Sequence, residues 1–255
     1  MPVIALYNLK GGVGKTAAAV NLAALAASEG EPCLLWDLDL QAAATFHLHG
    51  REGLPVRGRA ILSRRANLGD LPAETQVPRL DLLASDFSFR KLDTLLAEVD
   101  KPRKQLIQLL KPLRETYRYI FMDCPPVISL LAENIFRAAD LILVPLVPTP
   151  LCLRAYEEIV VFFHRKRLPS RKILSFFSMV EGRKKLHREL MSLSREREPG
   201  MCTAIIPYSA EVEKPSHSGR PLVVRQSKSR AAESYRALWT DVQGYLASLE
   251  IKGPS

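Results

Sequence analysis

A glycine-rich segment near the start of the chain has the residue types and spacing of a phosphate-binding loop. It follows the apolar run of residues 3–7 and reads Lys10-Gly11-Gly12-Val13-Gly14-Lys15-Thr16. Glycine allows backbone conformations that other residues avoid, and successive N–H groups can then point inward as a nest for an anion. The helix expected over residues 17–27 would direct the positive end of its dipole at the same phosphates.

Side chains of this segment would complete a nucleotide site. Lys15 is placed to reach the β- and γ-phosphates, and the Thr16 hydroxyl is placed to hold Mg²⁺. The ordinary loop pattern needs glycine where this chain has Leu9, and the chain has a second lysine, Lys10, in addition. A glycine-rich turn without a ligand is the alternative, but these residue types at these offsets should arise by chance in well under ~1 in 1000 such chains. We therefore predict phosphate binding.

Aspartates close two later apolar runs that read as strands. Asp37 and Asp39 end the run that starts at residue 32, and Asp123 ends the run of residues 119–123. Ligands of such sheets bind at the carboxyl ends of the strands, so these carboxylates should lie near the loop. A lone aspartate there is more often a turn cap. Beside a phosphate loop, we expect Asp123 to bind Mg²⁺ through water, and Asp39 to do likewise and to orient the attacking water. Asp37 could act only as a support for Asp39.

Strand-like and helix-like segments alternate along almost the whole chain. Continuous apolar strands separated by helices are typical of a mostly parallel twisted sheet with helices on both faces, the doubly wound α/β fold of P-loop NTPases. No linker or repeat divides the sequence, so we expect a single domain over residues 1–255, with residues 50–78 as its least regular part. The expected strands are residues 3–7, 32–37, 80–84, 119–123, 141–145, 173–179 and 203–206, and the expected helices are residues 17–27, 91–99, 102–115, one ending over 134–139, 154–167, 183–197 and 229–249.

Composition and cysteine usage favour a cytoplasmic protein. Apolar residues make up 47% and charged residues 25% of the sequence, as in soluble globular proteins. The chain enters an apolar strand at once, without a basic and apolar leader. Its most apolar stretch, residues 141–153, is interrupted by prolines and is too short to span a bilayer. The four cysteines lack C-x-x-C spacing or a histidine partner, so we expect reduced thiols.

Positive charge is concentrated in the second half of the chain. The net charge is +9, and residues 164–236 carry 17 Lys/Arg against 7 Asp/Glu, whereas residues 1–150 carry 17 against 16. A basic half beside a neutral half suggests a polyanionic partner. From charge alone, a solvated surface that happens to be basic explains the asymmetry equally well.

Six motifs in order give the chain a resemblance to a known family. The sequences K-G-G-V-G-K-T, D-L-D-L-Q, D-C-P-P, I-P-Y-S-A-E-V, E-K-P-S-H-S-G-R-P-L and, in the C-terminal stretch, S-K-S-R-A-A-E-S-Y-R-A-L closely resemble those of the ParA/MinD group of P-loop ATPases, whose Walker A loop is deviant. The element at residues 39–41 and the C-terminal stretch favour the ParA branch. The resemblance covers nearly the whole chain and is weak only around residues 50–78.

This resemblance implies an ATPase that forms an ATP-dependent sandwich homodimer and uses Mg²⁺. Lys10 would reach across the interface to the phosphates held by the other subunit, so Lys10, Lys15 and Asp39 would form the catalytic set. Pro207 would lie at the adenine. The implied ATP contacts are Lys10, Gly11, Gly12, Val13, Gly14, Lys15, Thr16, Ala17 and Pro207, and the implied metal ligands are Thr16, Asp39 and Asp123.

The resemblance to the ParA branch also implies partners. Its members bind nonspecific DNA as ATP dimers through phosphate contacts, and a small partner protein, ParB-like or a cargo adaptor, stimulates their weak hydrolysis and releases them. This implies a nucleoid-associated protein that positions or segregates a cargo, such as a chromosome, a plasmid, or a protein cluster or microcompartment. The candidate DNA contacts are Arg183, Lys184, Lys185, Arg188, Arg220, Arg225, Lys228 and Arg230.

The chain departs from the family pattern at two places beside the expected site. Leu40, Ala42 and Ala43 replace the usual proline, glycine and asparagine, and we expect this change to affect subunit contacts or the rate of hydrolysis. Ala17 and Ala18 follow the loop where many relatives have threonine, which removes a hydroxyl contact.

Other members of the superfamily are the alternatives. A membrane-surface ATPase of the MinD type needs a basic amphipathic C-terminal helix, but residues 239–255 contain Asp241 and Glu250 with only Lys252. We therefore expect no stable membrane association. A metallocluster or redox member needs paired cysteines at a dimer interface, and these cysteines show no such pairing. An accessory ATPase of the same family fits the motifs as well.

Overall fold

An eight-stranded sheet forms the centre of the computed structural model, which describes residues 1–48, 50, 53–197, 200–213, 219–226 and 228–251. The strand order is β3-β4-β2-β5-β1-β6-β7-β8, and every pair is parallel except β3 with β4. This confirms the predicted mostly parallel α/β fold. The strands are β1 (Val3–Leu6), β2 (Cys33–Asp37), β3 (Ala73–Glu74), β4 (Leu80–Leu83), β5 (Tyr119–Asp123), β6 (Leu141–Leu146), β7 (Ile173–Val180) and β8 (Met201–Pro207).

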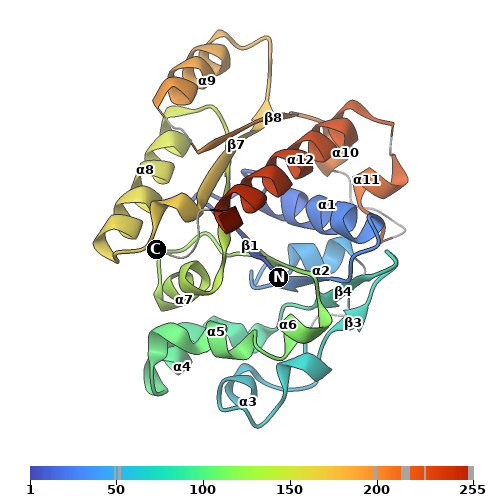
Figure 1. Cartoon of the computed structure of the whole chain (residues 1–255), viewed down its shortest axis with the longest axis vertical. Helices are drawn as coiled ribbons and strands as arrows, with labels where there is room; N and C mark the ends of the chain where they lie inside the picture. Colours follow the sequence, from blue (N-terminus) through green and yellow to red (C-terminus); the bar gives the residue numbers. More distant parts are fainter. Residues whose placement is uncertain (49, 51–52, 198–199, 214–218, 227, 252–255) are drawn as a thin grey trace.

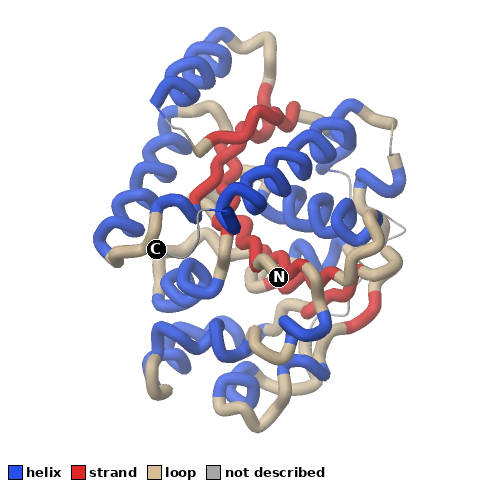
Figure 2. The backbone as a smooth tube through the Cα atoms, viewed as in Figure 1, coloured by secondary structure: helices blue, strands red, loops and turns tan. Residues whose placement is uncertain are grey.

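Helices cover both faces of the sheet, as Figures 1 and 2 show. One face packs against α1 (Lys15–Ser28), α2 (Ala43–His47), α11 (Leu222–Arg225) and α12 (Arg230–Ile251). The other face carries α3 (Gly58–Leu62), α4 (Leu92–Glu98), α5 (Gln105–Leu109), α6 (Leu113–Thr116), α7 (Leu130–Ala138) and α8 (Pro150–Arg165). Helix α9 (Lys185–Arg197) links β7 to β8, and α10 (Ala210–Glu213) follows β8. The 3₁₀ helices are η1 (Leu68–Asp70), η2 (Phe87–Lys91), η3 (Pro102–Lys104) and η4 (Ser170–Lys172).

Alternation along β1 explains why its sequence is apolar throughout. Val3 and Ala5 join the core on one face, while Ile4 and Leu6 join the core on the other, and all four are fully buried. A strand covered on both faces cannot alternate between apolar and polar residues. The same burial extends to β2, β5 and β6, which is why these segments read as continuous apolar runs.

The strand order brings the predicted carboxylates to the phosphate loop. Leu6 at the end of β1 pairs with Asp123 at the end of β5, and Asp123 pairs with Asp37 at the end of β2. From β1 the chain runs to β2 on one side of the sheet, and after β5 it crosses to β6 on the other side of β1. The loop therefore starts at a point where the direction of strand order reverses, the usual place for ligands in this fold.

Two expectations about individual elements were wrong. A single helix was expected over residues 102–115, but the structure has η3, α5 and α6 there. Pro112 supplies no N–H and its ring opposes a continuous helix, and it instead forms the N-cap of α6. Residues 50–78 also contain more regular structure than expected, namely α3, η1 and β3. Within the described residues, no helix is long and apolar enough to cross a membrane.

Candidate functional site: a phosphate loop with a buried aspartate behind it

The glycines of the loop adopt the conformations that an anion nest requires. Gly12 and Gly14 have φ angles of 69° and 90°, which lie in the left-handed region. A Cβ atom on Gly14 would also lie 2.8 Å from the Ser178 hydroxyl oxygen on β7, whereas a Cβ on Gly11 would meet nothing within 4 Å. Gly14 is therefore the glycine that both the backbone angle and the space require.

Asn8 fixes the start of the loop, a role the sequence reasoning missed. Its side chain is fully buried. Its Oδ1 accepts a hydrogen bond from the Lys10 N–H at 2.9 Å, and its Nδ2 donates to the Pro145 carbonyl of β6 at 2.8 Å. A polar residue directly after an apolar strand and before the glycines was the signal that could have found it.

A cavity of about 540 Å³ opens in front of the loop. The start of α1, the segment after β2, and the end of β8 each contribute to its wall, and Pro207 lies at the β8 side. Lys10 and Val13 are not part of the wall; Val13 is buried in the core, and Lys10 is half-buried. The lining residues are Gly11, Gly12, Gly14, Lys15, Thr16, Ala17, Asp39, Gln41, Ala43, His47, Pro126, Ser178, Met179, Ile206, Pro207, Tyr208, Ser209, Val212 and Tyr235.

Lys15 is the cation that faces this cavity from the loop. Only 7% of the residue is exposed, and its Nζ donates to the Lys10 carbonyl at 3.2 Å. Burial lowers the pKa of Lys15, while the nearby carboxylates of Asp123 and Asp39 act in the opposite direction. The arrangement gives a positive charge at the cavity wall near two carboxylates.

Asp123 is fully buried, and neither carboxylate oxygen has a hydrogen-bond partner among the described residues. Burial raises its pKa to about 8, and the neighbouring Asp37 adds to the rise. The Thr16 hydroxyl and Lys15 lower this pKa, although Thr16 lies outside the geometry of a regular hydrogen bond. A buried carboxylate with unused lone pairs beside a hydroxyl and a cation is an arrangement that fits Mg²⁺ and its water ligands.

The donor set fits Mg²⁺ better than a transition metal. Among the described residues, no group of three or more His, Cys, Asp or Glu side chains is placed to hold a metal ion. Mg²⁺ commonly uses one or two carboxylates, water and the phosphates of a bound nucleotide. Thr16 and Asp123 would hold it here, and the four cysteines are free thiols in the buried core.

Asp37 at the end of β2 and Asp39 just after it have different surroundings. Asp37 is fully buried and accepts hydrogen bonds from the Thr45 N–H and hydroxyl, both at 2.8 Å, and from the Asp39 N–H at 3.2 Å. This supports the interpretation that Asp37 acts as a support. Asp39 lines the cavity, and its Oδ1 accepts from the Gln41 N–H at 3.0 Å. Asp39 is therefore the carboxylate of this pair that can meet a ligand.

Ala42 adopts a backbone conformation that favours glycine. Its φ angle is 50°, in the left-handed region that costs an L-residue roughly 1–2 kcal/mol. The departure from the family pattern therefore places a side chain at a strained position of the backbone. His47 and Tyr235 also line the cavity; neither was predicted, since nothing near them in the sequence marks a ligand site.

The candidate DNA contacts form two groups. The first lies at the start of α9, where Lys184 and Lys185 pair with acidic neighbours and Arg188 donates to the carbonyls of Gly182 and Arg183. The second lies around α11 and the start of α12 (Figure 1). Arg225 of this group is half-buried and donates to the Glu211 carbonyl at 2.6 Å. The exposed members are Arg183, Lys184, Lys185, Arg188, Arg220, Lys228 and Arg230.

Comparison with known proteins gives a consistent result. A family model described as an AAA domain matches residues 1–175. The chain is 29% identical to the sporulation initiation inhibitor protein Soj of Bacillus subtilis, over 94% of this chain and 97% of Soj. It is 27% identical to the chromosome partitioning protein ParA of Caulobacter vibrioides, over 94% and 93%.

A solved structure agrees with the fold. The putative plasmid partition protein of Borrelia burgdorferi, bound to AMPPNP, matches with a TM-score of 0.80 and 18% identity, over 95% of this chain and 98% of that chain. Identity this low supports the architecture alone. Taken with the deviant loop, the strand order and the family model, it shows that the chain belongs to the ParA/MinD family of P-loop ATPases.

Proposed function

We propose that this protein is a ParA-type positioning ATPase, which binds ATP with Mg²⁺, dimerises, and binds nonspecific DNA in the ATP state. Its cargo is a chromosome, a plasmid or a protein assembly, and the protein acts on the nucleoid in the cytoplasm. Its similarity to the ParA and Soj proteins supports this proposal. The observation that carries it is Asp123, a buried carboxylate without a partner among the described residues, beside the Lys15 ammonium at the cavity wall.

The residues of the cavity have separate roles in ATP hydrolysis. N–H groups of the loop and the Lys15 ammonium bind the β- and γ-phosphates and stabilise the charge that moves to them. Asp39 orients the attacking water, and Asp37 holds the backbone of Asp39 in place. Thr16 and Asp123 would hold Mg²⁺ here, and the bound ion would neutralise charge on the phosphates.

Lys10 acts between two copies of the chain. Its side chain is half-buried and lies outside the wall of its own cavity. In the proposed dimer it contacts the phosphates bound by the other subunit, so that dimerisation depends on ATP. The basic residues at α9 and α11 then bind DNA phosphates from two subunits together, and a small ATPase-stimulating partner ends this state.

The test is DNA binding by the full chain with each nucleotide. Binding to a random-sequence duplex, followed by fluorescence anisotropy, should require ATP and should fall steeply between low and physiological salt, as phosphate contacts do. Equal binding with ADP and ATP would contradict the switch. Lys15→Ala is the control, because it should lose the ATP effect. ATP-dependent binding to anionic vesicles without DNA binding would instead favour the MinD-type membrane function.

A further inference from the structure

Two concave, positively charged surfaces lie side by side on α3, α4 and α5. Their volumes are about 640 and 480 Å³. Leu62, Ser63 and Val99 line both, so the two are parts of one surface, which we call the basic cavity pair. Figure 1 shows α3, α4 and α5 at the lower end of the molecule, opposite α9, α10 and α11. The surface is therefore separate from the ATP cavity and from the candidate DNA contacts.

The charge of this surface is strongly positive. Its first cavity is lined by Arg57, Arg59, Arg65 and Glu98, and its second by Arg64, Lys101, Lys104 and Asp100. Six cations thus face two carboxylates, which leaves a net charge of +4. Arg59 and Glu98 form an ion pair of 3.6 Å, but their side chains are 77% and 53% exposed, so this pair is worth little. The net charge of residues 1–150 is close to zero, so it did not reveal this cluster.

The charged residues form what we call the rims of the two cavities. The surface between them, which we call the floor, is apolar. Leu62 is buried, and Leu95 and Val99 are half-buried, so each presents some apolar surface to the cavities. A guanidinium fork binds a carboxylate through two parallel hydrogen bonds. A segment with carboxylates on either side of an apolar side chain would therefore satisfy both the rims and the floor. Duplex DNA offers phosphates on a convex backbone, and its apolar groups, such as the thymine methyl, lie in the grooves and not between neighbouring phosphates.

Two of the six described non-glycine residues with a positive φ angle lie at the same surface. Arg64 and Lys101 have φ angles of 57° and 52°, and such angles cost a residue with a side chain roughly 1–3 kcal/mol. Ala42 and Met179, two of the other non-glycine residues with positive φ, lie in or beside the ATP cavity. Strain of this kind gathers at ligand sites, because the surrounding structure holds a side chain where it is needed.

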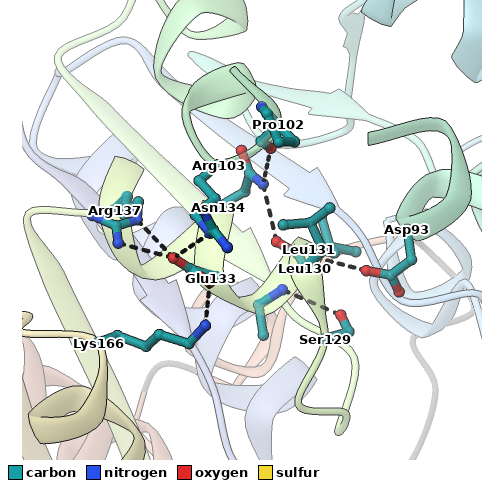
Figure 3. A network of polar contacts seen from close by, with 11 residues as sticks. Asp93, Pro102, Arg103, Ser129, Leu130, Leu131, Glu133, Asn134, Arg137 and Lys166 are labelled. Carbon is teal, nitrogen blue, oxygen red and sulfur yellow. Dashed lines mark hydrogen bonds and ion pairs between the residues drawn. The ribbon is translucent and has the colours of Figure 1, made fainter. Parts of the chain in front are cut away.

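The second cavity is built on a buried anchor in α7. Asn134 is fully buried, and its Oδ1 accepts from the Gln105 and Leu106 N–H groups at 2.9 and 3.3 Å. Its Nδ2 donates to the Pro102 carbonyl at 2.8 Å (Figure 3). The Gln105 amide in turn donates to the Asp100 and Lys101 carbonyls. These bonds fix the turn that presents Lys101. A surface ordered before binding loses less entropy when a ligand arrives.

We propose that the basic cavity pair is a docking surface for an acidic segment of a partner protein. Carboxylates of the segment pair with the cations of both rims, and an apolar side chain of the segment rests on the Leu62, Leu95 and Val99 floor. This proposal does not depend on ATP-dependent dimerisation or on DNA binding.

The probe is a labelled synthetic peptide in which glutamates flank a central leucine, titrated with the full chain by fluorescence anisotropy. Arg65→Glu with Lys104→Glu places one reversed charge in each cavity, and it should weaken binding by at least about tenfold. Lys111→Glu with Arg154→Glu makes the same change of net charge at exposed sites outside the pair and should keep most of the affinity. Replacing the central leucine by serine should weaken binding to the unchanged chain several-fold.

Three results would overturn the proposal. Equal weakening by the two double variants would mean that the peptide responds only to overall charge. Equal affinity of the leucine and serine peptides would remove the apolar floor from the interaction. Loss of duplex binding in Arg65→Glu with Lys104→Glu, with peptide binding unchanged, would assign the surface to nucleic acid. Thermal unfolding checks that the variants are folded, and Arg65→Gln with Lys104→Gln replaces the charge reversal if that variant is not.

Discussion

The Lys15 ammonium donates a hydrogen bond to the backbone carbonyl of Lys10 at 3.2 Å, so the loop closes on its own lysine. The two lysines nevertheless have different environments. Lys15 is buried at the cavity wall between carboxylates, and the Lys10 side chain lies outside that wall. Of two lysines five residues apart in sequence, Lys15 therefore faces the cavity and Lys10 does not.

Substitution of each lysine should separate nucleotide binding from dimerisation. Lys15→Ala removes the cation at the phosphates, and we expect ATP affinity to fall at least about a hundredfold, since a charged group facing phosphate is lost from a buried site. Lys10→Ala should bind ATP within a fewfold of the unchanged chain but stay monomeric. Titration with a fluorescent ATP analogue and light scattering on a sizing column measure the two properties. A normal ATP-dependent dimer of Lys10→Ala would refute its role across the interface.

The glycines of the loop should differ sharply in their tolerance of a methyl group. Gly14→Ala must accept a φ of 90° and a contact of 2.8 Å with the Ser178 oxygen, so we expect a loss of at least ~1–2 kcal/mol in the free energy of unfolding. Gly11→Ala, which meets no atom within 4 Å, is the matched control and should change stability by less than ~1 kcal/mol. Urea denaturation without nucleotide compares them. Equal losses would show that neither the backbone angle nor the Ser178 hydroxyl limits the residue at position 14.

The sequence was sufficient to predict the sheet and the carboxylates at its edge, because both depend on local patterns. Apolar strands that end in Asp37 and Asp123 can only meet the loop at one edge of a parallel sheet. Asn8 has a local signal, but one of its two bonds reaches the Pro145 carbonyl, which lies far along the chain and could not be foreseen. His47 and Tyr235 were missed for the same reason, since they reach the cavity from α2 and α12.

Charge averages were informative in one half of the chain and misleading in the other. Residues 164–236 are basic in sequence and carry exposed cations at α9 and α11. Residues 1–150 are neutral in sum, yet Arg64 and Lys101 lie at one surface because the fold brings α3 beside the end of α4. A net charge summed along the sequence does not show where the charges lie in the fold. It therefore cannot detect a surface at which cations gather away from the carboxylates that balance them in the sum.

A buried carboxylate in α7 should contribute measurably to stability. The Glu133 side chain is 4% exposed and pairs with Arg103, Arg137 and Lys166 at 3.3, 2.8 and 2.9 Å (Figure 3). Burial raises its pKa, but hydrogen bonds from Lys166 and Arg137 outweigh this and hold the pKa below its usual value. Glu133→Gln should therefore lower the free energy of unfolding by ~1–3 kcal/mol at neutral pH.

The size of this loss should depend on pH. Because the pKa of Glu133 is lower in the folded chain, its contribution is present above the unfolded value of about 4.3 and fades as the pH falls below it. Glu158→Gln is the control, since Glu158 forms an exposed pair with Arg154 and should change stability by less than ~1 kcal/mol. Urea denaturation at neutral and acidic pH tests both variants, and a loss for Glu133→Gln that persists in acid would contradict the charge explanation.

Asp39 should be required for turnover but not for ATP binding. Its carboxylate lines the cavity while Asp37 and Gln41 hold its backbone surroundings, so Asp39→Ala removes the group that orients water without removing the phosphate contacts. We expect hydrolysis to fall at least about a hundredfold and the ATP-bound dimer to persist. Phosphate release and sizing-column light scattering measure these effects, and unchanged turnover would assign the water-orienting role to another residue.

Asp123 should make the nucleotide-free protein less stable as the pH rises. Its pKa is raised to about 8 by burial, while the pKa of Asp37, also raised by burial, lies at about 6. Since aspartate in the unfolded chain has a pKa of about 3.9, the folded chain binds more protons between these values. The free energy of unfolding should therefore be greatest near about pH 4 and fall toward about pH 8. Asp123→Asn should be more stable than the unchanged chain at about pH 8 by roughly 1–3 kcal/mol, because a buried charge that Lys15 compensates only in part is gone.

The same substitution should cost the protein its response to ligand. ATP with Mg²⁺ should raise the melting temperature of the unchanged chain, because binding to the folded state adds to its stability. Asp123→Asn should lose most of this increase, since an amide is a much poorer partner for Mg²⁺ and its water. Glu115→Gln, at an exposed site, should leave both the pH profile and the ligand response unchanged. If Asp123→Asn were less stable than the unchanged chain at about pH 8, the Asp123 charge would be fully compensated by other groups of the folded chain. The argument that this site binds Mg²⁺ would then fail.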